Sequence, residues 1–143
     1  MTTHPYIKVS EVMTGPVQTI DRMASVREAL RLLDEKGVSS LVIERRDDRD
    51  ELGIVVISDI ARHVIAENRS PDRTNVYEIM SKPVLTIDRD MDIRHAIRLL
   101  DRFDLSRGLV VDHDRTLLGI VTLRDMVVRH AHIAETGEAE RRA

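Results

Sequence analysis

The sequence contains no cysteine, which excludes disulfides and thiolate chemistry and is compatible with a reducing compartment. Aromatic residues are few, with two tyrosines, one phenylalanine and no tryptophan, so a platform for stacking single-stranded nucleic acid has little to build from. No apolar run approaches the roughly 20 residues that a membrane-spanning helix needs. The N-terminus has neither the basic nor the apolar part of a secretory signal. We therefore expect a cytoplasmic protein with no membrane contact.

No stretch of the 143 residues concentrates charge of one sign, and the net charge is −3. A nucleic-acid surface needs a clustered basic field, so we expect no nucleic-acid partner. Arginine greatly outnumbers lysine, and guanidinium groups suit phosphate binding, although genome composition is the simpler explanation. The sequence also lacks a nucleophile elbow, a phosphate-binding glycine loop and a Rossmann glycine triplet, so we do not expect an enzyme.

The sequence does contain an internal duplication. Residues 9–43 align with residues 76–110, and 16 of these 35 positions are identical. The turn that follows is one residue longer in the first copy than in the second. After it, "GIVVISDI" at 53–60 aligns with "GIVTLRDM" at 119–126. A copy of about 60 residues would be marginally stable alone, so we expect the two copies to pack together.

Each copy predicts the same order of elements. A short extended piece leads into a helix, which in the first copy has a capping box of Ser25 and Glu28 and a terminating Gly37. In the second copy Asp92 is the expected cap. Two apolar strands follow in each copy, at 40–44 with 52–57 and at 108–112 with 117–122, and the closing helices are expected at about 59–67 and 123–133.

The expected fold class is therefore α/β (α+β), with two β-α-β-β-α repeats packed as a pseudo-two-fold pair. The expected parts are an N-terminal segment 1–7, a first repeat 8–67, a linker 68–75, a second repeat 76–133 and a flexible C-terminal tail 134–143.

The order of "MTGPVQTI", an A-x-x-L helix and "GIV" followed by an aspartate resembles the CBS (cystathionine β-synthase) domain, here as a tandem pair or Bateman module. The resemblance covers about residues 8–132 and implies a stand-alone CBS pair without an attached catalytic or transport domain. It also implies a regulatory role and a cleft between the repeats that binds an adenosine-containing ligand: AMP, ADP, ATP, S-adenosylmethionine or NAD(H). No cofactor is required, and the regulated partner protein is unknown.

The same resemblance assigns roles to residues. The family's aspartate takes the ribose hydroxyls, and the Ser or Thr three residues earlier contacts ribose or phosphate, which points to Asp125 and Thr122 in the second copy. In the first copy Asp59 matches, but Val56 stands where the hydroxyl belongs. The remaining implied residues line the adenine pocket: Thr14, Gly15, Val17, Ser81, Lys82 and Val84.

The chemistry of these residues supports two interpretations. A helix start favours phosphate, the ionised Asp125 carboxylate can accept both ribose hydroxyls, and Arg124 offers a forked donor. Yet Thr122-x-x-Asp125 is also the pattern of a helix cap, which is needed with or without a ligand. In the first copy Ser58 could cap the helix and Asp59 could still hold a ribose. The resemblance also implies a binding role for Arg62, which matches a basic position common in the family three residues after this aspartate. The same position in the second copy is Val128, with Arg129 next.

The histidines show no pair at metal-ligand spacing, so we expect no metal site, and His113 is expected to be a solvated residue of a hairpin turn. A second hypothesis is a ligand-free scaffold. The apolar arcs of the helices at 60–66 and 123–133 are wide enough to cover both a sheet and a second subunit, so we expect a homodimer.

Overall fold

The structure of the protein, a computed structural model, describes residues 6–81 and 84–142, with side chains described up to residue 132. The chain divides into two compact units. Unit 1 combines Met1–Pro16 with Leu85–Ala143, and unit 2 is the continuous stretch Val17–Val84. Each unit therefore contains the body of one repeat and the first residues of the other.

Unit 2 has the predicted β-α-β-β-α order. Its elements are β1 (Thr19–Ile20), α1 (Val26–Lys36), β2 (Ser40–Ile43), β3 (Gly53–Val56) and α2 (Ile57–Ile60), which continues as a π-helical segment, Ala61–Ile65. β1 pairs in parallel with β2, and β2 pairs antiparallel with β3, in one mixed sheet. A short 3-10 helix at Val76–Glu78, from the start of the second repeat, completes the unit.

Helix α1 shows why the sequence predicted it. The Ser25 hydroxyl accepts a hydrogen bond from the Glu28 N–H at 3.1 Å, and Gly37 ends the helix in the left-handed conformation with φ 63°. Residues three and four positions apart on the helix face the sheet, and Val26, Ala29 and Leu33 are buried in the core of unit 2.

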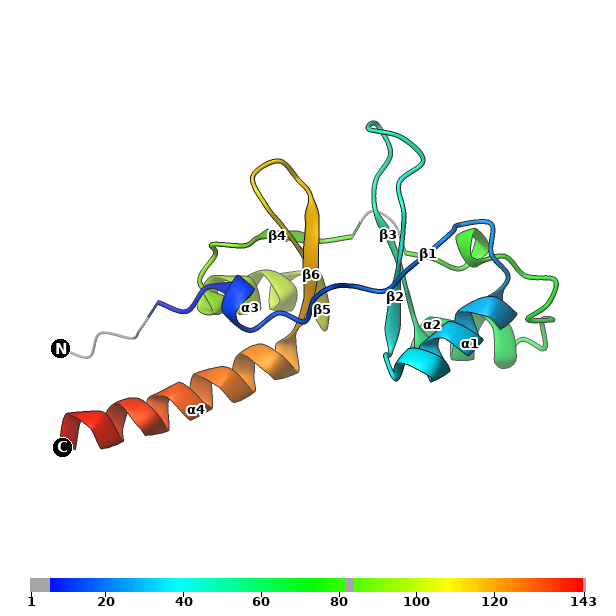
Figure 1. Ribbon diagram of the computed structural model, residues 1–143. Coiled ribbons are helices and arrows are strands. Elements are labelled where there is room, and N and C mark those ends of the chain that lie inside the picture. The colour runs from blue at the N-terminus through cyan, green and yellow to red at the C-terminus, as the bar shows by residue number, and fades with distance from the viewer. Residues whose placement is uncertain (1–5, 82–83, 143) are drawn as a thin grey trace. The chain divides into compact units, whose positions relative to one another are not determined.

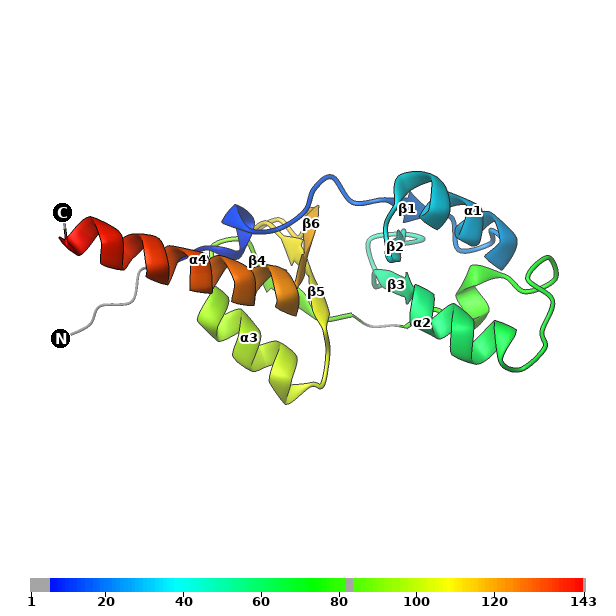
Figure 2. The same cartoon turned by 90° about the horizontal axis from the view of Figure 1, so that it is seen from below.

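Unit 1 repeats this architecture with its own mixed sheet. Its elements are a 3-10 helix (Val9–Glu11), β4 (Thr86–Asp88), α3 (Ile93–Arg102), β5 (Arg107–Val111), β6 (Leu117–Thr122) and α4 (Leu123–Arg142). β4 and β5 are parallel, and β5 and β6 are antiparallel. Helices α3 and α4 contact each other and lie side by side (Figure 2).

The exchanged N-terminal segment is joined to unit 1 by backbone hydrogen bonds. Val9 N–H donates to the Met91 carbonyl at 2.9 Å, and Thr14 exchanges two bonds with Ile120 of β6, at 2.8 and 2.9 Å. The segment, blue in Figure 1, runs beside the sheet of unit 1. In unit 2, Ser81 exchanges the corresponding bonds with Ile54 of β3, at 2.9 and 3.1 Å.

Three details differ from expectation. The helix expected at about 59–67 begins at Ile57, so Ser58 lies within its first turn and is not its cap. The residues expected as a flexible tail are helical as far as Arg142. The expected linker contributes to unit 2, because Val26 N–H donates to the Thr74 carbonyl at 2.8 Å and Thr74 is buried.

Within the described part of the chain, no helix is long and apolar enough to cross a lipid bilayer.

Candidate ligand-binding site

The start of α4 carries the residues singled out by the sequence. Thr122 ends β6, and its hydroxyl accepts a hydrogen bond from the Asp125 N–H at 3.1 Å. The cap interpretation is therefore confirmed, because this bond satisfies one of the unpaired donors of the first turn. It uses the backbone of Asp125 and not its side chain.

The carboxylate of Asp125 is half-buried and available. Among the described residues it takes part in no hydrogen bond or ion pair. Helix capping and ligand binding therefore do not compete for the same atoms, and both interpretations of the motif are compatible with this geometry.

Asp125 lies on a hollow of about 480 Å³ within unit 1. Thr14 and Asp125, from opposite ends of the sequence, meet there because the N-terminal segment packs beside β6. A volume of this size is within the usual range for small-molecule sites, ~300–1,000 Å³. The lining residues are Glu11, Val12, Thr14, Arg124, Asp125, Val128, Arg129 and His132.

The charged side chains around the hollow suit a ligand that carries both an anionic group and hydroxyl groups that donate hydrogen bonds. Glu11 is partly engaged, since its carboxylate accepts from the Lys8 N–H at 2.8 Å. Arg124 and Arg129 form no ion pair with any residue of the described chain. Guanidinium groups bind phosphate through forked hydrogen bonds, whereas an ionised carboxylate accepts hydroxyl protons.

The corresponding aspartate of unit 2 has a different environment. Asp59 Oδ2 accepts from the Val56 N–H at 3.4 Å, and Asp59 Oδ1 lies 3.5 Å from Nη2 of Arg62. Its side chain is only 13% exposed. Both carboxylate oxygens of Asp59 are thus in contact with donors from its own unit.

A family model, the CBS domain, matches residues 9–66 and 76–131, which together cover most of the chain. The protein belongs to the CBS domain family. Its two repeats are a CBS pair, and the β-α-β-β-α order seen in each unit agrees with this assignment.

Relatives of this CBS pair include proteins of several kinds. An uncharacterized protein of Methanopyrus kandleri is 30% identical over 94% of this chain and 68% of its own length. A 33.4 kDa protein of Thermofilum pendens is 33% identical over 87% of this chain, which spans only 44% of that relative. An inosine-5'-monophosphate dehydrogenase of Korarchaeum cryptofilum is 32% identical over 88% of this chain and 25% of its own length.

Solved structures resemble the CBS pair over nearly its whole length. The hexameric CBS-CP12 protein from bloom-forming cyanobacteria has a TM-score of 0.84 and 32% identity, over 92% of this chain and 75% of that one. The CBS domain pair of protein MJ0100, in complex with 5'-methylthioadenosine and S-adenosylmethionine, has a TM-score of 0.76 and 28% identity, over 90% and 98%. CBSX2 in complex with AMP has a TM-score of 0.69 and 28% identity, over 89% and 98%.

The residues expected at the site are divided between the units. Thr14, Thr122, Arg124 and Asp125 belong to unit 1, where Gly15 also lies against β6. The others that are described belong to unit 2: Val17, Ser58, Asp59, Arg62, Ser81 and Val84. Lys82 lies outside the described residues.

Sequence reasoning missed part of the lining of the hollow. From Asp125, the positions three, four and seven residues onward, Val128, Arg129 and His132, share one helix face and all line the hollow. That spacing could have identified them. No sequence pattern marks Glu11 as a lining residue, because it reaches the hollow only through the packing of the N-terminal segment against the second repeat in unit 1.

The CBS pair anchors this segment through Asp92, the cap of α3. Its carboxylate accepts from the Arg94 N–H at 3.3 Å and pairs with the Arg94 guanidinium at 2.9 Å. Burial alone raises the pKa of Asp92, but hydrogen bonds from Arg94 and from the Ile7 backbone, with the Arg94 charge, hold the pKa below its usual value. Ile93 N–H also donates to the Ile7 carbonyl at 2.8 Å.

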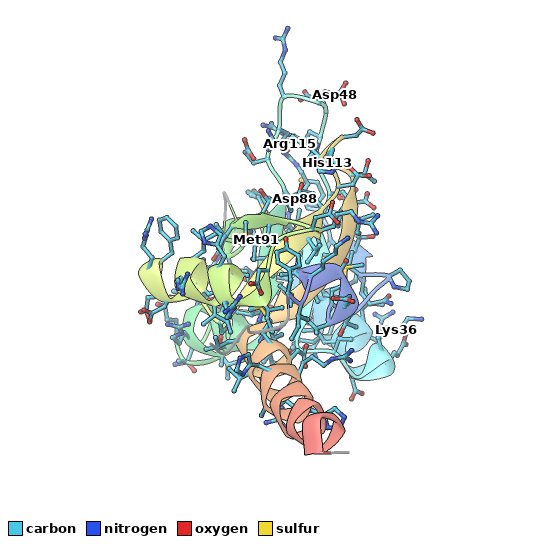
Figure 3. The ribbon with its side chains drawn as sticks, turned by 90° about the vertical axis from the view of Figure 1, so that its left-hand side faces the viewer. Lys36, Asp48, Asp88, Met91, His113 and Arg115 are labelled. Atoms are coloured by element: carbon cyan, nitrogen blue, oxygen red, sulfur yellow. The ribbon has the colours of Figure 1, made fainter. Side chains whose placement is uncertain are left out.

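His113 is not simply a solvated turn residue. Its side chain is 76% exposed, but Nδ1 lies 3.2 Å from Asp88 Oδ2 and Nε2 lies 3.4 Å from Asp90 Oδ2. Asp88 and His113 are labelled in Figure 3. Lys8 and Arg89 also pair with Asp90. One ligand atom from each of Asp88, Asp90 and His113 lies within 4.8 Å of the other two, so these three residues form a group that could hold a metal ion. The expectation of no metal site therefore stays a prediction.

Proposed function

We propose that this CBS pair is a regulatory sensor that binds an adenosine-containing ligand in the hollow of unit 1. One observation carries the proposal. Thr14 of the N-terminal segment and Asp125 of α4 line the same hollow, together with Arg124, although no local sequence pattern connects them. The candidate ligands are AMP, ADP, ATP, S-adenosylmethionine and NAD(H).

The chemistry of the hollow fits the two ends of such a ligand. The available Asp125 carboxylate accepts the two ribose hydroxyls. Arg124, in the first turn of α4, donates to a phosphate or carboxylate group. The relatives with bound AMP, 5'-methylthioadenosine and S-adenosylmethionine support the proposal, because these compounds share the adenosine part.

The proposed signal passes through the N-terminal segment. This segment lines the hollow at Glu11, Val12 and Thr14 and continues at Pro16 directly into unit 2. A ligand that binds one conformation of the segment more tightly shifts the population toward that conformation, by no more than its differential affinity. A partner protein that recognises this conformation then receives the signal.

The test is a thermal-shift titration of the wild type and of Asp125→Ala with the five candidate ligands. A ligand at 100 times its dissociation constant stabilises the fold by about 2.7 kcal/mol. We expect at least one compound to raise the melting temperature of the wild type and to leave Asp125→Ala unchanged. No shift with any compound at millimolar concentration would refute the proposal.

A second candidate function, a homodimerising scaffold, is favoured by the outer surface of α4. Leu123, Val127 and Val128 are exposed there, with Val127 at 51%. A second hollow, of about 320 Å³, lies between α3 and α4, and Ile97 and Val127 form its apolar part. Apolar side chains that leave water on association provide the driving force for dimers. A relative that is a hexamer shows that related chains assemble.

Sedimentation velocity at tens of micromolar tests the scaffold. We expect a dimer for the wild type and for Asp125→Ala, and a monomer for Val127→Glu, because the introduced carboxylate would have to be desolvated in the interface. A compact monomeric wild type would exclude this candidate.

A further inference from the structure

The two copies of the GIV motif use their aspartates differently. In unit 1, Thr122 supplies the acceptor for the first turn of α4, and the Asp125 carboxylate is left without a partner among the described residues. In unit 2, Val56 has no hydroxyl, and the Asp59 carboxylate itself accepts the Val56 N–H. Because Val56 stands at the position of Thr122, the aspartate three residues later itself accepts a backbone hydrogen bond in unit 2, whereas in unit 1 it does not.

Arg62 completes the difference. It lies 3.5 Å from Asp59 Oδ1 and also donates from Nε to the Ser58 carbonyl at 3.5 Å. These contacts are long, but they occupy the one carboxylate oxygen that the Val56 N–H does not use. The matching position in unit 1 is Val128, so Asp125 has no arginine three residues onward, and it forms no ion pair within the described chain.

The cationic side chains also differ between the copies. Arg124 and Arg129 line the hollow of unit 1, whereas the aligned residues of unit 2 are Ser58 and His63. Glu78 of unit 2 aligns with Glu11 of unit 1, and an ion pair with Arg69 at 3.0 Å neutralises the Glu78 carboxylate. Unit 1 therefore offers two guanidinium groups to an anion, and the aligned positions of unit 2 offer none.

We infer that each chain binds a single adenosine phosphate, in unit 1, and that the matching site of unit 2 is closed by its own Asp59–Arg62 pair. This inference rests on the proposed function and adds two statements to it: one ligand for each chain, and a preference for ligands with phosphate. Asp125 holds the ribose, and Arg124 with Arg129 holds the phosphate end.

Isothermal titration calorimetry of the full chain with adenosine, AMP and ATP tests both statements. We expect a stoichiometry of one and at least about tenfold tighter binding of AMP or ATP than of adenosine, since charged hydrogen bonds are about twice as strong as neutral ones. Asp125→Asn should weaken binding at least about tenfold. The matched variant Asp59→Asn should leave affinity and stoichiometry unchanged.

A double variant, Val56→Thr with Arg62→Val, tests the reason for the closure. It copies the unit 1 motif into unit 2, so the stoichiometry should rise from one toward two for adenosine, which needs no guanidinium partner. A stoichiometry that stays at one would show that Val56 and Arg62 are not what closes unit 2.

The outcomes separate the inference from the proposed function. Two ligands bound to each wild-type chain, or equal losses for Asp59→Asn and Asp125→Asn, would overturn the inference and leave the proposed function standing. Adenosine binding as tight as ATP would overturn the phosphate preference alone. No binding of any of the three compounds would overturn the inference, and a negative screen with S-adenosylmethionine and NADH would then remove the proposed function as well.

Discussion

Replacing Gly119 with alanine should detach the N-terminal segment from unit 1. A Cβ atom at Gly119 would lie 2.7 Å from the Thr14 carbonyl oxygen and 2.8 Å from the Met13 sulfur. The methionine side chain can move, but the carbonyl belongs to the backbone that exchanges two hydrogen bonds with Ile120. The segment must therefore shift away from β6.

The size of this effect follows from the lost contacts. Two backbone hydrogen bonds contribute about 1 kcal/mol each, and residual overpacking costs about 1–3 kcal/mol. Alanine offsets about 0.4–1 kcal/mol by restricting the unfolded chain, because Gly119 does not have a positive φ. We expect Gly119→Ala to lower the free energy of unfolding by about 2–3 kcal/mol, taking partial relaxation into account.

The duplication supplies a matched control. A Cβ at Gly53, the aligned glycine of unit 2, would meet the Met80 sulfur at 3.0 Å and the Ser81 carbonyl oxygen at 3.5 Å. The methionine side chain can yield, so Gly53→Ala should cost less than about 1 kcal/mol. Urea denaturation measures both variants, and ligand titration of Gly119→Ala should also show a loss of affinity, because Thr14 leaves the hollow. Equal midpoints for the two variants would refute this reasoning.

Two further predictions concern the caps and pH. Thr122→Val should remove the cap of α4 and lower the free energy of unfolding by about 1 kcal/mol, and Val56→Thr should stabilise unit 2 by a smaller amount, both measured by urea denaturation. The pKa of Asp92 lies below its unfolded value, so its stabilising contribution is present above that unfolded value and is lost as pH falls through the folded pKa. Urea midpoints at pH 6 and pH 3 should therefore differ less in Asp92→Asn than in the wild type, and an unchanged difference would exclude this role.

Local patterns in the sequence predicted the elements and the cap. Ser25, Glu28 and Gly37 mark the two ends of α1 within a dozen residues, and the Thr122 cap depends on a spacing of three. These features arise from short-range sterics and hydrogen bonding, so a single sequence reveals them. The repeated motifs and their order also identified the CBS family, which the family model confirms.

Long-range packing could not be predicted in the same way. Thr14 and Val17 are three residues apart but belong to different units, and no periodicity marks the crossing between them. The carboxylates beside His113 are equally non-local, because Asp88 and His113 meet only through the pairing of β4 with β5. Such contacts depend on which surfaces pack together, and periodicity describes only one segment at a time.

The exchange of first segments has a consequence for how this chain can be divided. A fragment cut at the repeat boundary, after residue 75, would lose Val76 and Ile79, which lie in the core of unit 2. A fragment of residues 17–84 keeps that core intact, so unit 2 is an insertion in a discontinuous unit 1. A single repeat expressed alone would have to take its missing segment from a second molecule. Joining the repeats in one chain makes that exchange intramolecular, at an effective concentration in the millimolar range for a short connection.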